Sequence, residues 1–451
     1  MLLVSSNKFQ FAERGGNAEN PHMEDSSSSK NYFGATRWAI YDLGHTAFSM
    51  IVLAVLFPIL FNEYWSTSLP EPEAKTFWYS VTLAGASIFV ALLSPLLAVV
   101  AQSGGLRMMF FRVLAGTGIA GMAGLAFIGE GNWQAASLIY VLAAIGFFGA
   151  NLFYDSLLLD VAAPEKRHFI SGVAFSLGYL GGVLLLGGIF LWMQFYSEAF
   201  GAGRLFVLGA LWWLVFAFPL LLRRETPLQA KNSETSSRRH HFFNLRETCI
   251  AFWRERRLRW FMLAYFCYID GVHTIITSAV RYGNALGFSQ NDLFLALFIV
   301  QIFGVPCAMI FGQLGKIFGA KPVLFTALTI YIGVALYGSM MPTGTLTLFG
   351  FETSPMFILA ALIGMVQGGV QALSRSFFAT LIPAGREISF FGFYSMIGRC
   401  STVLGPILLA VIAAVFPSGS DGLFSTRAGI AAIALLFVAG MVLLAKVGKK
   451  S

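Results

Sequence analysis

The sequence predicts an all-α polytopic membrane protein with twelve transmembrane helices in two six-helix pseudo-repeats. Three observations predict this fold class. Of the 451 residues, 57% are apolar and only 12% are charged, whereas about a quarter of the residues of a soluble domain are charged. The apolar residues form twelve continuous runs, each long enough to cross about 30 Å of hydrocarbon as a helix. These runs do not alternate with polar residues, as the strands of a membrane barrel would, and the two halves of the chain share motifs.

The twelve spans are placed by the windows of highest hydropathy. The first six are expected near 38–61, 77–100, 107–128, 133–162, 169–192 and 204–222. The second six are expected near 260–280, 292–314, 321–341, 355–382, 388–416 and 427–446. The chain is therefore expected to consist of a polar N-terminal tail, a first six-helix bundle, a basic linker, a second six-helix bundle and a short tail, at 1–37, 38–222, 223–259, 260–446 and 447–451.

The distribution of Lys and Arg predicts the orientation. The N-terminal tail, the even-numbered connections and the C-terminus carry 23 of these residues, whereas the odd-numbered connections carry 4. Because cytoplasmic connections are enriched in Lys and Arg, both termini are expected in the cytoplasm. The first 37 residues contain no apolar core of signal-peptide length. Either Met1 or Met23 could be the true start of the chain.

The linker at 223–259 is the longest polar connection, with 10 Lys and Arg against 4 Asp and Glu. Aromatic residues do not alternate with its charges as in a surface that stacks bases, so no nucleic-acid partner is expected. Membrane lipids with anionic headgroups account for the basic charge. Three of the four Cys lie in apolar spans, and the fourth, Cys249, lies in the basic linker, so no disulfide framework is predicted.

Two pairs of motifs relate the halves of the chain. Asp-x-x-His-Thr occurs at Asp42 in the first span and at Asp270 in the seventh. The connections after spans two and eight are both glycine-bearing turns that end in a cation. Repeats around a central site are the architecture of transporters that rock between two states. The residues expected to form the conformational-switch loops are Arg107, Gly312, Lys316, Gly319 and Lys321.

Several spans carry motifs typical of one transporter superfamily. They are Trp38-x-x-Tyr41-Asp42, Phe153-Tyr154-Asp155-Ser156, Ser171-Gly172 with Gly178-Tyr179-Leu180-Gly181-Gly182, Asp270-Gly271-Val272, Gln367-Gly368-Gly369 with Ser374-Arg375-Ser376, and Phe390-Phe391-Gly392-Phe393-Tyr394 with Gly405-Pro406. The chain resembles the major facilitator superfamily. Within it, the chain is similar to the branch of autophagy-related vacuolar amino-acid effluxers and uncharacterised bacterial permeases.

The resemblance implies a function and a setting. A major facilitator protein is a secondary active transporter that works by alternating access, without a cofactor, and it lines its central cavity with spans one, four, seven and ten. The branch implies an amino acid or similar zwitterion as substrate, moved by efflux. We expect a monomer in a bacterial inner (plasma) membrane rather than an organelle membrane, with protons and a small-molecule substrate as partners.

The chain departs from the superfamily's pattern at a few positions. The turn after span two has Gln102 where the superfamily usually has Asp, and the second copy has Lys316. The branch usually has Ala-Asn-Ser where this chain has Gly44-His45-Thr46, and Asn where it has Asp155. The two added titratable groups suggest a changed substrate or coupling ion.

Ionisable residues inside the spans are the candidates for transport, because a charge in the bilayer costs a few kcal/mol unless it faces a cavity or a partner. Those expected to form proton-coupling charge pairs are Asp42, Asp155, Asp270, Arg375 and Arg399. The acidic groups are predicted to pair with the two arginines, and protonation of one carboxylate to release the pair. The residues expected to line the substrate cavity are Tyr41, His45, Asn151, Tyr154, His273, Gln367 and Gln371.

Structural roles compete with these functional ones. Asp42 and Arg375 could simply lock helices together. No metal site is predicted, since neither His45 nor His273 has a Cys or second His at ligand spacing. Asp160 and Arg112 are expected to snorkel at the ends of their spans. The tryptophans are expected in an interfacial belt or against lipid; examples are Trp212, Trp213 and Trp253.

Two other function classes compete with transport. A membrane-embedded enzyme is not expected, because the sequence has no His-Glu-x-x-His, no Gly-x-Ser-x-Gly and no Cys/His cluster. A lipid or amphiphile flippase, or a non-transporting receptor, could use the same fold. A closed polar chamber would favour a water-soluble solute over a lipid.

Overall fold

The computed structural model describes residues 21–195, 203–224, 241–348, 350–383, 385–416 and 423–448. Within these residues, twelve helices are long and apolar enough to cross a membrane, which confirms the predicted number. Each predicted span overlaps one of these helices, and the ends agree to within a few residues. Much of the predicted N-terminal tail, residues 225–240 of the linker and residues 449–451 lie outside the described residues.

The first six spans form one bundle. Its main helices are α1 (Pro21–Ala47), α3 (Pro72–Gly104), α4 (Arg107–Gly124), α5 (Trp133–Ser156), α7 (Arg167–Phe195) and α8 (Gly203–Leu221). Shorter segments complete the spans: η1 (Phe48–Leu56), α2 (Phe57–Leu60), η2 (Phe61–Trp65), η3 (Leu125–Phe127), α6 (Leu158–Val161) and η4 (Pro164–Lys166).

The last six spans form the second bundle. They are α10 (Arg256–Ala285), α11 (Gln290–Phe318), α12 (Ala320–Met340), α13 (Pro355–Leu381), the interrupted α14 (Glu387–Cys400), η6 (Ser401–Val403) and α15 (Leu404–Val415), and α16 (Phe424–Ala445). Before them, α9 (His241–Arg254) belongs to the linker, and a small antiparallel hairpin of β1 (Leu346–Leu348) and β2 (Phe351–Thr353) precedes α13.

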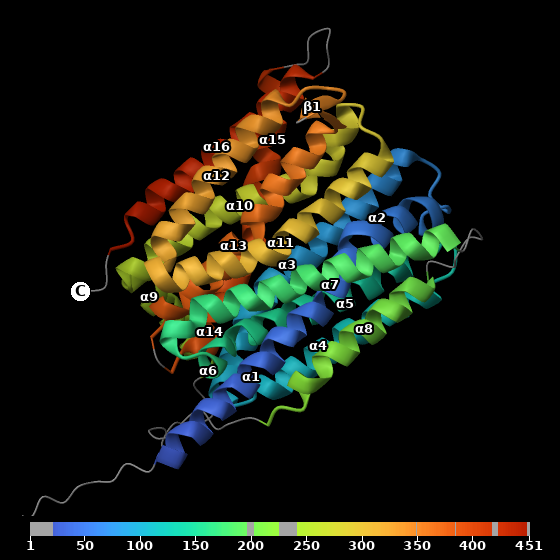
Figure 1. Ribbon diagram of the computed structural model, residues 1–451. Helices are drawn as coiled ribbons and strands as arrows, with labels where there is room; N and C mark the ends of the chain where they lie inside the picture. The colour runs from blue at the N-terminus through green and yellow to red at the C-terminus, as the bar shows by residue number, and fades with distance from the viewer. Residues whose placement is uncertain are drawn as a thin grey trace, which may run out of the picture.

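The two bundles lie side by side and meet mainly through four helices. Figure 1 shows α7 of the first bundle beside α11 of the second along the middle of the molecule, and these two helices are in extensive contact. Further contacts join α7 to α13 and α3 to α14. The seam between the bundles therefore runs along α7 and α11 and between α3 and α14.

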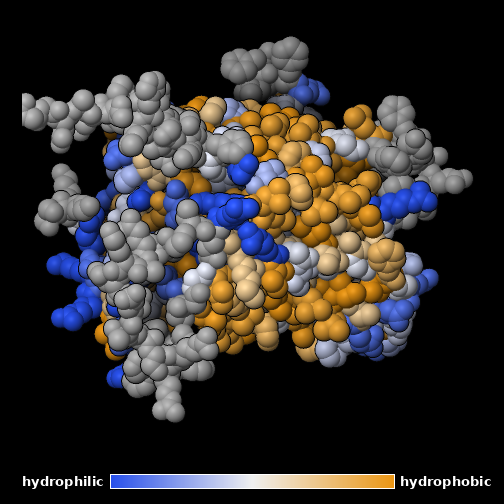
Figure 2. All heavy atoms as spheres, turned by 90° about the horizontal axis from the view of Figure 1, so that it is seen from below, coloured by the Kyte–Doolittle hydropathy of each residue, from blue (hydrophilic) through white to orange (hydrophobic). Residues whose placement is uncertain are grey.

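Charge and hydropathy divide the surface into bands. Figure 2 shows a wide hydrophobic band with hydrophilic side chains gathered on either side of it. One end of the bundles, where α3 ends and α14 begins, carries most of the described cations; we call it the basic face. Its cations include Arg107, Lys166, Arg167, Arg223, Arg256, Arg257, Arg259, Lys316, Lys321, Arg386 and Lys446.

Two spans depart from a regular α-helix near their middle. The first span changes at Phe48 from an α-helix to a π-helix, one turn after His45. The eleventh span is interrupted after Cys400 by a 3₁₀ turn in which Thr402 is not helical (φ −75°, ψ 15°). Such irregularities in membrane helices often lie at functional sites, because they free backbone groups and reorient side chains.

The tryptophan prediction is wrong for Trp213. Its side chain is fully buried in the first bundle and packs edge-on against the rings of His45 and Phe147. Gly118 makes room for it, because a Cβ there would lie 2.6 Å from the indole. The aromatic ring thus holds His45 in place from α8 rather than facing lipid.

Candidate transport site

A single arginine joins the two bundles near the basic face. Arg375 of α13 donates from Nη1 to Oδ1 of Asp155 at 3.0 Å, from Nε to Oγ of Ser171 at 3.1 Å, and from Nη2 to the Ser171 carbonyl at 3.2 Å. Both partners belong to the first bundle. Arg375 is only 3% exposed, so these charge-assisted hydrogen bonds form away from water, where they are strong.

Asp42 of the first span is a second carboxylate beside the same guanidinium. Its Oδ2 lies 3.8 Å from Nη1 of Arg375, and its Oδ1 lies 3.9 Å from Nδ1 of His45. Of the three acids expected to pair with an arginine, the structure places Asp42 and Asp155 beside Arg375. We call Asp42, Asp155, Ser171 and Arg375 the interbundle charge cluster.

Aromatic rings enclose the guanidinium of Arg375. It lies 4.7 Å from the ring centre of Trp38, 5.4 Å from that of Tyr154 and 4.6 Å from that of Phe175. Trp38 stacks on Tyr154 and donates from Nε1 to its carbonyl at 2.8 Å. These contacts stabilise the cation and fix its position, since aromatic faces attract a desolvated guanidinium.

The charges of the cluster do not balance. Two carboxylates face one guanidinium, so the cluster carries one negative charge when both acids are ionised and His45 is neutral. An uncompensated charge at a buried membrane position is costly. Binding of one proton to either carboxylate would bring the net charge of the cluster to zero.

Asp270 occupies a different environment from Asp42, although both begin the same motif. Its side chain is fully buried in α10 and forms no ion pair with any described residue. Both of its carboxylate oxygens are buried and have no hydrogen-bond partner among the described residues.

Arg399 has no carboxylate partner within the described residues, which differs from the expected pairing. Its guanidinium lies 4.0 Å from the ring centre of Phe148 on α5, in the other bundle. The side chain is half-buried and sits at the end of α14, one residue before the break in the span. Sequence alone could not place it, because its neighbours come from α5 and α10, which only the packing of the bundles brings together.

The residues expected to line the cavity have mixed environments. Tyr41, His45 and Tyr154 are buried in the first bundle, where their rings contact one another through Tyr41. The remaining four are half-buried: Asn151, His273, Gln367 and Gln371. Buried ring nitrogens of both histidines, His45 Nε2 and His273 Nδ1, have no hydrogen-bond partner among the described residues.

Gln102 closes the basic face between α3 and α14. Its Oε1 accepts from the backbone amides of Ile388 at 2.9 Å and Ser389 at 3.4 Å, and its Nε2 donates to the Gly385 carbonyl at 3.1 Å. One amide from the first bundle therefore caps the first turn of a helix in the second. The neutral side chain of Gln102 joins the two bundles through hydrogen bonds to the backbone.

We predict that Gln102→Ala favours opening of the basic face. Loss of an N-cap acceptor costs about 1 kcal/mol, or about a fivefold change in the ratio of closed to open molecules. Spin labels at the exposed residues Leu106 and Lys316 would report this as a larger long-distance population. Gln102→Glu is the control, because it keeps the acceptor and suits a helix N-terminus; equal distance distributions for wild type and Gln102→Ala would contradict the assignment.

Two facing glycines bring α7 and α11 into backbone contact. A Cβ at Gly172 would lie 2.6 Å from the Ala308 carbonyl oxygen and 2.8 Å from Cα of Gly312. A Cβ at Gly312 would in turn lie 2.9 Å from Cα of Gly172. No side chain larger than hydrogen fits at either position while the bundles are closed.

We therefore expect Gly172→Ala to weaken closure of the basic face by about 1–3 kcal/mol, as overpacking of a tight contact does. Transport should fall several-fold, and spin labels at Leu106 and Lys316 should show a larger long-distance population. Gly188→Ala on the same helix is a matched control, because a Cβ there meets nothing within 4 Å. Equal transport by the two variants would show that this contact does not limit the cycle.

The residues expected in the switch loops lie in other settings. Gly312 and Lys316 lie within α11, and Lys316 is exposed. Gly319 adopts a positive φ of 83° in the turn before α12. Lys321 donates to the carbonyls of Ala445 and Val447, so it ties α12 to α16 within one bundle.

Arg107 and Asp160 form an ion pair inside the first bundle, and Arg223 also contacts Asp160, at 3.4 Å. Arg112 donates to the carbonyls of Leu221 and Arg223 at the end of α8. The expected snorkelling of Asp160 and Arg112 is therefore replaced by contacts that join three helices at the basic face.

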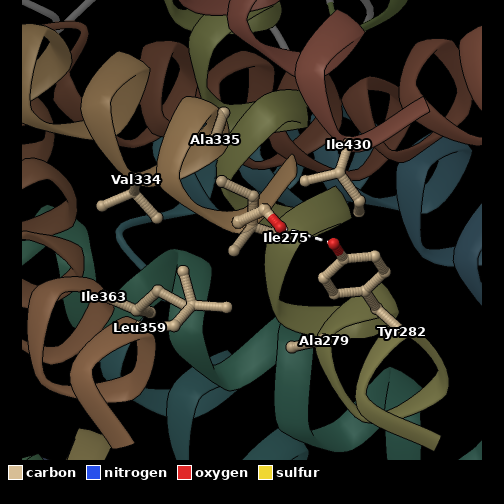
Figure 3. Close-up of a pocket in the computed structure, with 9 residues that line it drawn as sticks. Ile275, Ala279, Tyr282, Val334, Ala335, Leu359, Ile363 and Ile430 are labelled. Atoms are coloured by element: carbon tan, nitrogen blue, oxygen red, sulfur yellow. Dashed lines mark hydrogen bonds between the residues drawn. The ribbon is translucent and has the colours of Figure 1, made fainter. Parts of the chain in front are cut away.

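A small hollow in the second bundle is too small and too apolar to be the transport site. Figure 3 shows Ile275, Leu359, Ile363 and Ile430 around it, and Tyr282 at its edge donates to the Gly338 carbonyl. Its volume is about 20 Å³, room for roughly one water molecule. The charged residues of the spans lie elsewhere.

Some residues of the site were not singled out by the sequence. Ser171 was noted only as part of a motif, yet it binds Arg375 through both its hydroxyl and its carbonyl. Neutral residues such as His168, whose Nδ1 lies 2.8 Å from Oγ of Ser376 across the seam, also join the bundles. A search for buried charges cannot find them.

Comparison with known proteins agrees with this architecture. The profile of the family described as Vacuole effluxer Atg22 like matches residues 160–450. The uncharacterised MFS-type transporter YxiO of Bacillus subtilis is 34% identical over 421 residues, which cover 92% of this chain and 94% of the relative. Autophagy-related protein 22 of Coccidioides immitis is 28% identical over 54% of this chain, and this chain covers only 43% of the fungal protein.

Solved structures of major facilitator transporters share the fold. The human organic anion transporter MFSD10 superposes with a TM-score of 0.70 at 16% identity, covering 92% of this chain and 99% of that one. The proton:xylose symporter XylE gives a TM-score of 0.69 at 12% identity, covering 93% and 96%. These neighbours are transporters and not enzymes. The chain belongs to the family described as Vacuole effluxer Atg22 like, within the major facilitator superfamily of membrane transporters.

Proposed function

We propose that this protein is a proton-coupled secondary active transporter that exports a small zwitterionic solute, such as an amino acid. The observation that carries the proposal is the interbundle charge cluster, in which two carboxylates of one bundle share one guanidinium of the other. A proton on either carboxylate weakens its attraction to Arg375. Because Arg375 bridges the bundles, protonation would favour separation at the basic face.

The distribution of positive charges supports the orientation of the proposed cycle. We take the basic face as cytoplasmic, with both termini there, in a bacterial inner membrane. In the state with a closed basic face, the interbundle charge cluster would then take up protons from outside the cell. A proton entering from outside would favour opening to the cytoplasm, and its release there would accompany binding of the solute to be exported. The name of the matching family supports the direction of transport.

Both signs of charge between the bundles support a zwitterionic substrate. Arg399 is a cation without a carboxylate partner among the described residues, and Asp42 and Asp155 are acids that share one cation. A solute that carries a carboxylate and an ammonium group can pair its carboxylate with Arg399 and its ammonium group with Asp42 or Asp155. We propose that a monomer suffices, since the charged groups meet between the two halves of one chain.

Transport assays in proteoliposomes test the proposal. Vesicles loaded with single L-amino acids should release at least one of them faster when the outside is made acidic, and a proton should enter in exchange. Release of no amino acid under any gradient would contradict the proposed substrate class. Movement of a fluorescent lipid between leaflets, in place of solute release, would favour the flippase alternative.

A further inference from the structure

We propose that Arg399 binds the carboxylate of the transported solute, at an anion site formed by both bundles. This inference rests on the proposed function and names the protein group that recognises one end of its substrate. Arg399 lies in the eleventh span and Phe148 in the fourth, and the guanidinium lies 4.0 Å from the ring centre. The site thus spans the seam that must open and close during transport.

The two arginines of the spans that lie between the bundles differ in how their charges are used. Arg375 makes three hydrogen bonds and an ion pair to the first bundle. Arg399 makes neither an ion pair nor a side-chain hydrogen bond to any residue in the described ranges, although it lies in the middle of a transmembrane span. Because a cation without a partner is costly at mid-depth in a membrane, we expect a mobile anion to pair with Arg399.

The surroundings of Arg399 suit the carboxylate of a solute. The titratable groups that interact with it electrostatically are Tyr140 on α5 and Tyr265 and His273 on α10. The Tyr265 hydroxyl lies against Gly398, where a Cβ would be 3.1 Å away. Tyrosine hydroxyls and a guanidinium donate hydrogen bonds to carboxylates, and none of these groups is an acid that would repel one.

The break in the eleventh span gives the site a second, independent feature. α14 ends at Cys400, and the 3₁₀ turn that follows separates Arg399 from the helix α15. Interrupted membrane helices at mid-depth are typical of solute-binding positions, because their ends can bind a ligand and can move. Arg399 is therefore on a segment that can respond to the bound anion.

Thermal stabilisation of the purified full-length protein tests the inference. The probes are the twenty L-amino acids, their α-carboxamides, a set of small monocarboxylates, and chloride. At least one amino acid should raise the melting temperature, while its carboxamide should bind at least about tenfold more weakly, as expected for loss of a charged hydrogen-bond partner. Arg399→Met should lose this stabilisation, and Arg399→Lys should retain part of it.

Two controls separate binding from folding. Arg281→Gln removes an exposed cation from α10 and should bind the amino acid as the wild type does. Arg399→Met must elute as a monodisperse species and melt cooperatively without ligand; if it does not, Arg399→Lys and the carboxamide series carry the test.

The outcomes distinguish this inference from the proposed function. If an amino acid binds Arg399→Met as tightly as the wild type, the anion site is refuted while the proposed function stands. If only monocarboxylates bind, and binding needs Arg399, the anion site stands while the zwitterionic substrate fails. Stabilisation by chloride alone, or by none of the probes, would overturn the carboxylate site.

Discussion

Arg375→Met is expected to abolish net transport, because it removes the one cation that the carboxylates of Asp42 and Asp155 share. Removal of one partner from a buried ion pair typically costs about 3–5 kcal/mol, since the remaining charge stays without compensation. Here the substitution should destabilise the closed basic face as well as the folded state, because Arg375 contacts Asp155 and Ser171 across the seam. Transport in proteoliposomes and the melting temperature measure the two effects.

Two further variants separate the role of the charge from that of the hydrogen bonds. Arg375→Lys keeps the cation but cannot donate in three directions, so transport should fall but not vanish. The double variant Arg375→Met with Asp155→Asn should be more stable than Arg375→Met alone, because it removes one of the unpaired acids. An additive double variant would show that the two residues do not interact energetically.

Asp155→Asn is expected to separate transport from the proton gradient. The amide imitates the protonated acid and keeps an acceptor for Arg375, so position 155 no longer titrates and the cluster is neutral while Asp42 is ionised. Exchange of labelled for unlabelled solute should continue, whereas accumulation driven by a pH gradient should fall at least about tenfold. Asp42→Asn should act in the same direction but less strongly on closure, because Asp42 lies 3.8 Å from Arg375 and Asp155 only 3.0 Å.

Unchanged pH-driven accumulation by both asparagine variants would contradict this account of coupling. Asp270→Asn is a useful comparison, because Asp270 has the same motif but no ion pair with any described residue. If Asp270→Asn alone abolished coupling, the proton site would lie in the second bundle, next to the break in the eleventh span.

The sequence predicted the helices well because bilayer thickness imposes a simple rule on chain composition. All twelve spans were found, since each must be apolar over about 20 residues whatever its neighbours are. The pairing of Arg375 with acids could also be expected. A charge inside a span needs a partner, and the available acids of the first bundle, Asp42 and Asp155, are few.

The neighbours of some site residues depend on tertiary packing and could not be predicted from the sequence. Arg399 was expected to pair with an acid, but its neighbours are Phe148 and residues of α10, which only the packing of the bundles brings together. Gln102 carries no charge, so a search for ionisable residues does not identify it. Its role as a cap for α14 depends on where α3 ends. Trp213 is a residue of the type that often faces lipid, but it is buried because Gly118 leaves space for its ring.

Measurement of the distance between the bundles as a function of pH tests the central claim most directly. Spin labels at Leu106 and Lys316, in a protein with its four cysteines replaced by serine, report on the basic face from opposite bundles. Closely spaced carboxylates take up protons at higher pH than isolated ones. On acidification from about pH 8 to about pH 5, the wild type should therefore gain a longer-distance population. The double variant Asp42→Asn with Asp155→Asn should show the same distribution at every pH. A wild-type distribution that does not change with pH, or an equal response in the double variant, would contradict the claim that protons on this cluster control the basic face.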